Sequence, residues 1–171
     1  MKKIYKYLGK PENKIKSQIA SNREIVRKPE DVLIWLKKNK YKISESKTIT
    51  ATFIINKDEE MWIADRNSEH ILCAKGRDVL SAGEITFCLI RNKVIVSDIT
   101  NQSTGYCPEP DSWSYVSKTL DDIGLEHPDF FTEVFQFRFC YHCSSINIVK
   151  DNWFFCAVCN ASLSAQWNFV C

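Results

Sequence analysis

Apolar residues at helical spacing occur early in the chain, at positions 32, 33, 35 and 36. A proline and two acidic residues precede them and three lysines follow, at Pro29, Glu30, Asp31, Lys37, Lys38 and Lys40. Proline at the first position, acids in the first turn and lysines in the last turn are typical of a helix. The sequence therefore predicts a helix over residues 29–40 whose apolar side packs on a sheet.

From residue 47 onward, β-branched and aromatic residues fill short stretches that are bounded by turn-forming residues. This pattern predicts five strands, at 48–55, 61–64, 70–74, 84–90 and 94–99. We expect turns at residues 56–59 and at Arg91-Asn92-Lys93. Short strands with close turns and no helix between them favour an antiparallel sheet or a small barrel.

Residues 110–120 have apolar side chains on one side and predict a second helix. Asp111 or Ser112 is its expected N-terminal cap. The stretch 121–124, which ends in Gly124, is expected to terminate it.

The most specific motif in the chain is two C-x2-C pairs separated by twelve residues, Cys140, Cys143, Cys156 and Cys159. Four thiolates at this spacing can occupy the corners of a tetrahedron around one zinc ion. Residues 135–139 alternate into the first pair, and a predicted hairpin of 146–149 and 153–155 leads to the second. This region resembles a zinc ribbon, which implies a small sheet that holds one structural Zn²⁺.

Four thiolates leave no coordination position open, so the expected site is structural and does not activate water. The zinc deaminase signature, H-x-E with P-C-x-x-C, is absent. His142 lies inside the first pair, and we expect it to be exposed rather than a ligand. Ser144 and Asn160 follow the two pairs, where such loops usually place a glycine with a left-handed backbone.

These patterns together predict an α+β fold, with a central antiparallel β module, two flanking helices and a C-terminal zinc ribbon. We divide the chain into a basic N-terminal arm and helix (1–46), a β-rich module with one helix (47–132) and the zinc ribbon (133–171).

Residues 1–22 are polar and lysine-rich without a sustained period, so we interpret them as an extended or loosely ordered arm. Ser21 and Glu24 have the spacing of a capping box, but Pro29 interrupts any helix that begins there. Residues 1–47 hold fourteen basic and five acidic residues, a net charge of +9, and the rest holds nine and sixteen, a net charge of −7. Such a basic segment can bind phosphates or an acidic partner, or pair with the chain's own acidic surface.

The ribbon segment carries no net charge, because Arg138 and Lys150 are balanced by Glu133 and Asp151. Its aromatic residues could stack on bases, but it lacks the phosphate-binding charge that supplies most nucleic-acid affinity. We therefore favour protein docking or simple stapling for the ribbon. Nucleic-acid binding through the basic N-terminal segment is kept as an alternative.

A second group of chemistry-bearing residues lies between positions 70 and 108. It consists of a histidine, a tripeptide at the start of the predicted strand 84–90, and three residues of the loop after the predicted strand 94–99. These residues are His70, then Ala82, Gly83 and Glu84, then Ser103, Tyr106 and Pro108. At these positions the chain resembles a small β-rich module of bacterial toxin-associated proteins and plant IQ-motif proteins. Thr104 and Gly105 stand where that module has glycine and histidine. The resemblance implies a toxin or defence setting and no particular activity, and the chain shows no calmodulin-binding IQ helix.

The candidate ligand-binding residues of this group are His70, Ser81, Glu84, Ser103 and Tyr106. An enzyme hypothesis places a site around His70, Glu84 and Tyr106, because an imidazole titrates near neutral pH beside a carboxylate and a hydroxyl. The structural alternative is that Tyr106 and Pro108 form a rigid turn packed against the sheet.

The sequence does not assign a single role to the cysteines outside the two pairs. Cys73 and Cys88 lie in apolar stretches typical of core thiols. Cys73 and Cys107 are candidate nucleophiles, and with His70 they are candidate ligands of a second metal ion, but no spacing specifies either role. Cys171 has no assigned role.

Apolar runs are far shorter than the ~20 residues of a membrane span, and lysines interrupt the start before a signal peptide could form. We therefore expect a cytoplasmic protein, whose cysteines stay reduced. The favoured function is a zinc-stabilised binding or adaptor module with a protein partner, in a bacterial toxin or defence system if the resemblance holds. The alternatives are an enzyme at the second group and a nucleic-acid binder.

Overall fold

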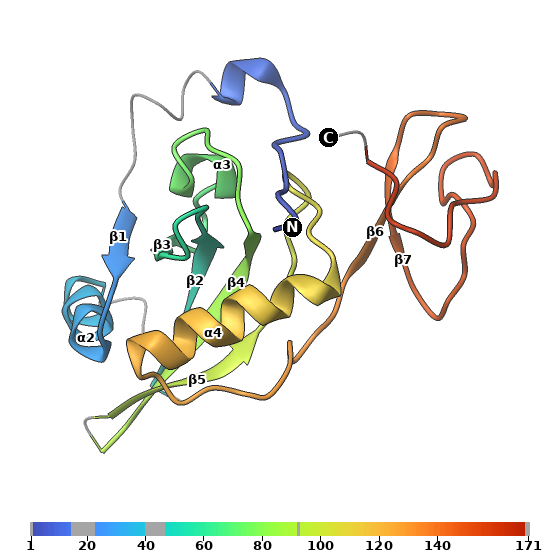
Figure 1. Cartoon of the computed structure of the whole chain (residues 1–171). Helices are drawn as coiled ribbons and strands as arrows, with labels where there is room; N and C mark the ends of the chain where they lie inside the picture. The colour runs from blue at the N-terminus through green and yellow to red at the C-terminus, as the bar shows by residue number, and fades with distance from the viewer. Residues whose placement is uncertain (1, 15–22, 40–46, 92, 170–171) are drawn as a thin grey trace.

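The computed structural model describes residues 2–14, 23–39, 47–91 and 93–169, which form a five-stranded sheet and a smaller C-terminal sheet (Figure 1). The large sheet has the spatial order β1 (Arg23–Val26), β3 (Met61–Asp65), β2 (Thr48–Ile55), β4 (Ser81–Ile90) and β5 (Lys93–Ile99). Every neighbouring pair is antiparallel. The predicted α+β class is confirmed, with an open sheet rather than a barrel.

One face of the sheet is buried beneath α2 (Pro29–Lys38) and α4 (Trp113–Ile123). The period of two places Phe53 and Phe87 on this face, and the ring of Trp35 packs edge-on to Phe87 at 6.4 Å between centroids. The two flanking helices are therefore confirmed and share one face. Lys40, expected in the last turn of the first helix, lies outside the described residues.

Both ends of α4 lie at predicted positions. Gly124 terminates it with a left-handed φ of 82°, as expected of a C-terminal glycine. At the other end Ser112, one of the two predicted caps, follows the turn η2 (Pro110–Ser112) and occupies the N-cap position of α4, but its side chain makes no capping hydrogen bond. The Ser112 hydroxyl instead lies 3.0 Å from that of Ser81 in the core.

The opposite face is covered by the N-terminal segment, the loop after β5 and α3 (His70–Cys73). The strand predicted at 70–74 is therefore wrong. The Gly76 N–H donates to the Ile71 carbonyl oxygen at 3.0 Å, which closes a helical turn that buries Ile71 and Cys73. A short apolar run has no period that separates strand from helix, so packing against the sheet decides.

The described part of the N-terminal arm belongs to the fold, which contradicts the interpretation as a loosely ordered segment. Tyr5 is fully buried and exchanges two backbone hydrogen bonds with Val79, at 2.8 and 3.0 Å. The Leu8 N–H donates to the Gly105 carbonyl oxygen at 2.8 Å, and residues 11–14 are helical. Ser21, of the suggested capping box, lies outside the described residues.

The edge strand β1 is a further difference, since the sequence predicts no strand at residues 23–26. It pairs with β3 from Arg23 opposite Ala64 to Val26 opposite Met61. Its four residues are too few to show a period, and its partner lies almost forty residues away. The remaining strands match their predicted positions within a few residues at each end.

The ribbon contains a hairpin, but not the predicted one. Strand β6 (Gln136–Phe139) pairs with β7 (Ile146–Val149) across the first cysteine pair, and residues 153–155 form no strand with β7. Phe155 instead forms an isolated bridge with Ser162. The loop that holds Cys140 and Cys143 is itself the turn of this hairpin. The spacing of the cysteines along the chain does not reveal this.

Polar contacts join the ribbon to the loop between β5 and η2. Arg138 of β6, with a side chain 5% exposed, pairs with Glu109 at 2.9 Å and donates to the carbonyl oxygens of Ser164 and Ala165. The Trp167 indole donates to the Cys107 carbonyl oxygen at 2.8 Å.

Among the described residues, no helix has the length and apolar character to cross a membrane.

Candidate metal centre

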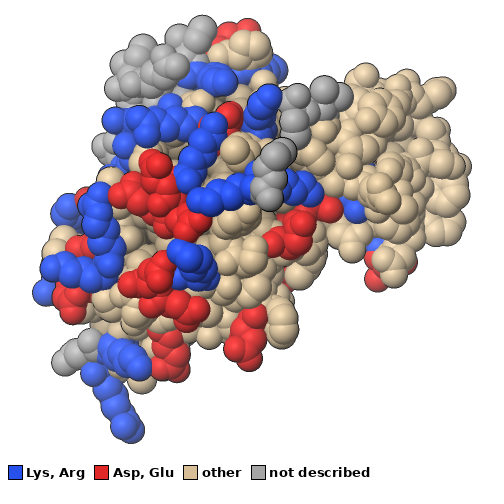
Figure 2. Space-filling view, in the orientation of Figure 1, with Lys and Arg blue, Asp and Glu red and all other residues tan. Residues whose placement is uncertain are grey.

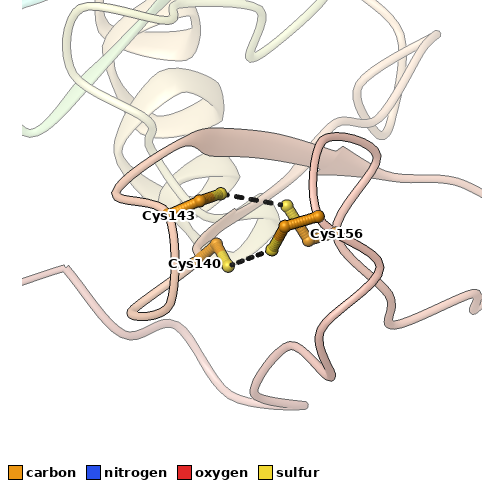
Figure 3. Close-up of side chains that lie close together, drawn as sticks. Cys140, Cys143 and Cys156 are labelled. Atoms are coloured by element: carbon orange, nitrogen blue, oxygen red, sulfur yellow. Dashed lines mark hydrogen bonds between the residues drawn. The ribbon is translucent and has the colours of Figure 1, made fainter.

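Four thiols converge at the end of the small sheet, where the two cysteine loops meet (Figure 3). Their sulfur atoms all lie within 4.8 Å of one another. The Cys140 and Cys159 sulfurs are 3.6 Å apart, and those of Cys143 and Cys156 are 3.5 Å apart. Four sulfurs bound tetrahedrally at ~2.3 Å from one ion are about 3.8 Å apart. The cluster therefore has the dimensions of a four-thiolate metal site.

The two loops that hold the sulfurs have the same backbone geometry. In each loop the first cysteine donates its N–H to the carbonyl oxygen five residues later, at 2.9 Å for Cys140 and 2.8 Å for Cys156. Ser144 and Asn160 donate back to those cysteines' carbonyl oxygens at 2.8 and 2.9 Å. Their φ angles of 60° and 59° are the left-handed values that the sequence predicts at these positions.

Neighbouring groups favour thiolates at this site. The Ser145 hydroxyl lies 3.2 Å from the Cys143 sulfur and 3.3 Å from that of Cys156. This contact is the main cause that lowers the pKa of both thiols, to about 5 for Cys156. The Ala161 N–H favours the Cys159 thiolate, but burial and the adjacent sulfurs outweigh it and raise the pKa of Cys159 to about 12. Four thiolates this close repel one another, so full ionisation requires a cation between them.

The surroundings of the cluster fit a closed site. His142 is exposed, as expected, and the four sulfurs complete a tetrahedral set without it. Within the described part of the chain, the four cysteines are the one group of three or more histidine, cysteine or carboxylate side chains close enough to share an ion. A second site at His70, Cys73 and Cys107 is therefore not formed there.

The remaining thiols divide between core and surface. Cys73 and Cys107 are buried, and burial raises the pKa of each to about 12, so both stay protonated at neutral pH. The core interpretation of Cys73 agrees with the structure, whereas Cys88 is only half-buried. Cys171 lies outside the described residues.

Three of the candidate ligand-binding residues are buried in the β module. Tyr106 is fully buried and donates its hydroxyl to the Arg77 carbonyl oxygen at 2.6 Å. The Ser81 hydroxyl pairs with that of Ser112, and the Ser103 hydroxyl has no hydrogen-bond partner among the described residues. Their positions fit the structural alternative, and ligand binding by them stays a prediction.

The other two candidates, His70 and Glu84, lie nearer the surface. The His70 Nε2 atom is 3.0 Å from the Gly83 carbonyl oxygen, and Glu84 forms an ion pair with Arg66 at 3.2 Å. Burial lowers the pKa of His70 despite the opposing effects of the Gly83 bond and the Glu84 charge. The imidazole is therefore neutral at pH 7.

His70 also lines a cavity of about 310 Å³, of which the other four candidates are not part. Its further lining residues come from the N-terminal segment, the residues that begin α3 and the loop after β5: Tyr7, Gly9, Asn13, Glu69, Ile71, Thr104 and Gly105. Local spacing in the sequence does not relate Tyr7, Asn13 or Glu69 to His70, so these three residues were not predictable as its neighbours.

The basic residues of the N-terminal third mix with acidic ones on the face shown in Figure 2. Lys2 pairs with Glu59, Lys3 with Glu109, Arg27 with Glu60 and Lys38 with Glu24. Three of these four acidic partners lie beyond residue 47. This is the self-pairing that the charge distribution allowed, and it lowers the positive charge that the segment offers to phosphates.

Comparisons with protein families, with curated proteins and with solved structures found no match to this chain. The resemblance of residues 70–108 to the toxin-associated and IQ-motif module thus receives no support from relatives. The four-cysteine cluster is the feature that defines the class: a protein with a small sheet closed by four cysteines that are positioned to bind a metal ion.

Proposed function

We propose that this chain is a zinc-stabilised cytoplasmic binding module whose ribbon docks a protein partner. Zinc is the expected metal, because tetrahedral four-cysteine sites with C-x2-C pairs are typical of structural Zn²⁺. The ion would hold the two cysteine loops together and fix the surface that they carry. The toxin or defence setting rests on the resemblance alone and is not part of this proposal.

The observation that carries the docking role is a set of exposed apolar side chains on the ribbon. They are Val134, Tyr141, Ile146, Ile148, Trp153, Phe155 and Val158, and their exposed fractions run from 38% to 73%. The rings of Trp153 and Phe155 lie 4.8 Å apart, and Ile146 and Ile148 share one face of β7. Exposed apolar side chains concentrated in one small part of a protein are typical of interaction sites.

A hollow of about 520 Å³ lies within this surface, between the segment that enters β6 and the turn after β7. Val134 and Ile148 line it together with polar groups of residues 150–152. A cavity of this size accommodates a large apolar side chain of a partner, in the manner of an interface anchor.

The charge of the ribbon favours a protein over a nucleic acid. Figure 2 shows this end of the molecule nearly free of charged side chains. Arg138, one of the two basic residues of the segment, is buried in its pair with Glu109, which leaves Lys150 as the accessible cation. Nucleic-acid affinity depends on several phosphate contacts, so this surface suits an apolar protein partner better.

Elemental analysis tests the metal. We expect one zinc per chain in the wild type and in the control Cys88→Ser, whose thiol lies outside the cluster. Cys156→Ser should lose the metal and lower the melting temperature, because binding of the ion is coupled to folding of the ribbon. Iron in place of zinc, or a metal content unaffected by Cys156→Ser, would contradict the proposal.

Site-specific cross-linking tests the docking surface. A photoreactive phenylalanine at Val158 on the ribbon should capture a protein that the same group at Ile90, exposed on the large sheet, does not capture. The captured protein is then purified, and its affinity is measured for the wild type and for Trp153→Ser. Equal capture from both positions, or equal affinities, would refute the docking role.

A further inference from the structure

The cavity beside His70 is built from three segments that are distant in sequence. Tyr7, Gly9 and Asn13 form one wall, Glu69 to Ile71 form the second, and Thr104 with Gly105 forms the third. A backbone hydrogen bond of 2.8 Å from Leu8 to Gly105 closes the first wall onto the third. The cavity, which we call the His70 cavity, therefore exists because the N-terminal segment is docked.

The wall at Tyr7 is fixed by two glycines. A β-carbon on Gly9 would lie 2.2 Å from the Tyr7 hydroxyl oxygen, and one on Gly105 would lie 3.0 Å from the Tyr7 ring. The ring also packs edge-on against Tyr106, with the centroids 5.7 Å apart. Tyr7 thus presents an aromatic ring in a defined position to the cavity.

The histidine tautomer in the cavity follows from its partner. A carbonyl oxygen only accepts hydrogen bonds, so the contact of 3.0 Å to Gly83 requires the proton on Nε2 of His70. The neutral imidazole then carries its lone pair on Nδ1. Among the described residues Nδ1 has no hydrogen-bond partner, which leaves it as an acceptor for a ligand.

A second acceptor is held next to this histidine. The Asn13 side-chain N–H₂ donates to the Glu69 carboxylate at 3.4 Å and to the Tyr7 hydroxyl oxygen at 3.3 Å. Glu69 has no ion-pair partner among the described residues. No lysine or arginine lines the cavity, so the charge of Glu69 is unbalanced there.

We propose that the His70 cavity binds a small organic cation with several N–H donors, of the amidine, guanidine or primary amine class. The Glu69 carboxylate balances the positive charge, the Nδ1 atom of His70 accepts a second N–H, and the Tyr7 ring contacts the apolar part of the ligand. A volume of about 310 Å³ accommodates a molecule of about ten non-hydrogen atoms. This ligand site is separate from the ribbon and from the proposed docking surface.

Titration of the ¹⁵N-labelled full-length protein with benzamidine tests the proposal, with benzamide as the neutral molecule of the same shape. Benzamidine at millimolar concentration should shift the backbone amide signals of residues 69–71 and 104–105. Glu69→Gln should weaken binding by about tenfold or more, since hydrogen bonds to charged groups contribute most. Glu30→Gln, at an exposed carboxylate on α2, should leave the affinity unchanged.

A second variant tests the site without altering Glu69. Thr104→Arg places a guanidinium at the exposed rim of the cavity and should abolish binding of benzamidine while the amide spectrum stays folded. Equal binding of benzamide, signal shifts confined to other regions, or unchanged affinity in Glu69→Gln and Thr104→Arg would overturn the proposal. Metal content and partner binding are independent of these results.

Discussion

The hydroxyl of Tyr106 gives a sharp test of how the loop after β5 is held. The Tyr106 ring is fully buried, and its hydroxyl donates to the Arg77 carbonyl oxygen at 2.6 Å. Burial, with smaller effects of the nearby Asp78, Cys73 and Tyr7, raises the pKa of Tyr106 well above its usual value, so the hydroxyl keeps its proton. Tyr106→Phe removes this one hydrogen bond and leaves the packing of the ring unchanged.

The expected cost follows from two contributions. A neutral hydrogen bond stabilises a folded protein by about 0.5–1.5 kcal/mol, and a buried carbonyl group left without a partner costs about 1–3 kcal/mol. The hydrogen bond to the Arg77 carbonyl oxygen is only partly buried, so the lower end of these ranges applies. We expect a loss of about 1–2 kcal/mol, which for a chain of this size lowers the melting temperature by about 2–8 °C.

Urea unfolding of the variant, followed by tryptophan fluorescence, measures this loss. Tyr115→Phe is the matched control, because the half-buried Tyr115 hydroxyl makes no hydrogen bond to any residue that the structure describes, and its effect should stay below about 0.5 kcal/mol. Tyr106→Phe with the stability of Tyr115→Phe would refute the structural role of the hydroxyl. A ligand-binding role of Tyr106 would then regain support.

Three further predictions concern the packing and charges of the fold. Gly83→Ala should cost more than the ~1–3 kcal/mol of ordinary overpacking, because its β-carbon would lie 1.9 Å from a backbone carbonyl oxygen; a urea midpoint like that of the wild type would contradict this. Hydrogen bonds, first from Lys118 and then from Lys2, lower the pKa of Glu59 to about 2. The contribution of the Glu59 carboxylate to folding stability is therefore complete above pH ~4.5 and is lost as the pH falls towards 2. Plots of unfolding free energy against pH for the wild type and Glu59→Gln should converge at that low pH. Arg138→Met should cost about 3–5 kcal/mol, because it removes the buried partner of the pair with Glu109 and its hydrogen bonds to the carbonyl oxygens of Ser164 and Ala165, and calorimetry within ~1 kcal/mol of the wild type would disprove it.

Local patterns in the sequence were sufficient to predict most of the fold and the four-cysteine cluster. The alternation of apolar residues in strands such as 48–55 depends only on which side of a strand faces the core, so it is visible without the partner strands. The spacing of the cysteine pairs is likewise local, because each loop of a few residues brings two sulfurs close together. The left-handed residues Ser144 and Asn160 follow from the same loop geometry.

Contacts between distant segments decided the rest. The stretch 70–74 became a helix because the sheet offered a surface for Ile71 and Cys73, and β1 became a strand because β3 lay beside it. Neither segment is long enough for its own period to select a structure.

The His70 cavity and the position of the ribbon depend on tertiary structure alone. Tyr7 meets Gly105 across almost a hundred residues, and Arg138 meets Glu109 only after both sheets have formed. The spacing of residues along the chain does not predict these contacts, because they depend on where the whole backbone places each side chain. The sequence thus determined most of the strands, the two main helices and the four thiols, and packing decided the remaining short elements and which surfaces they all form together.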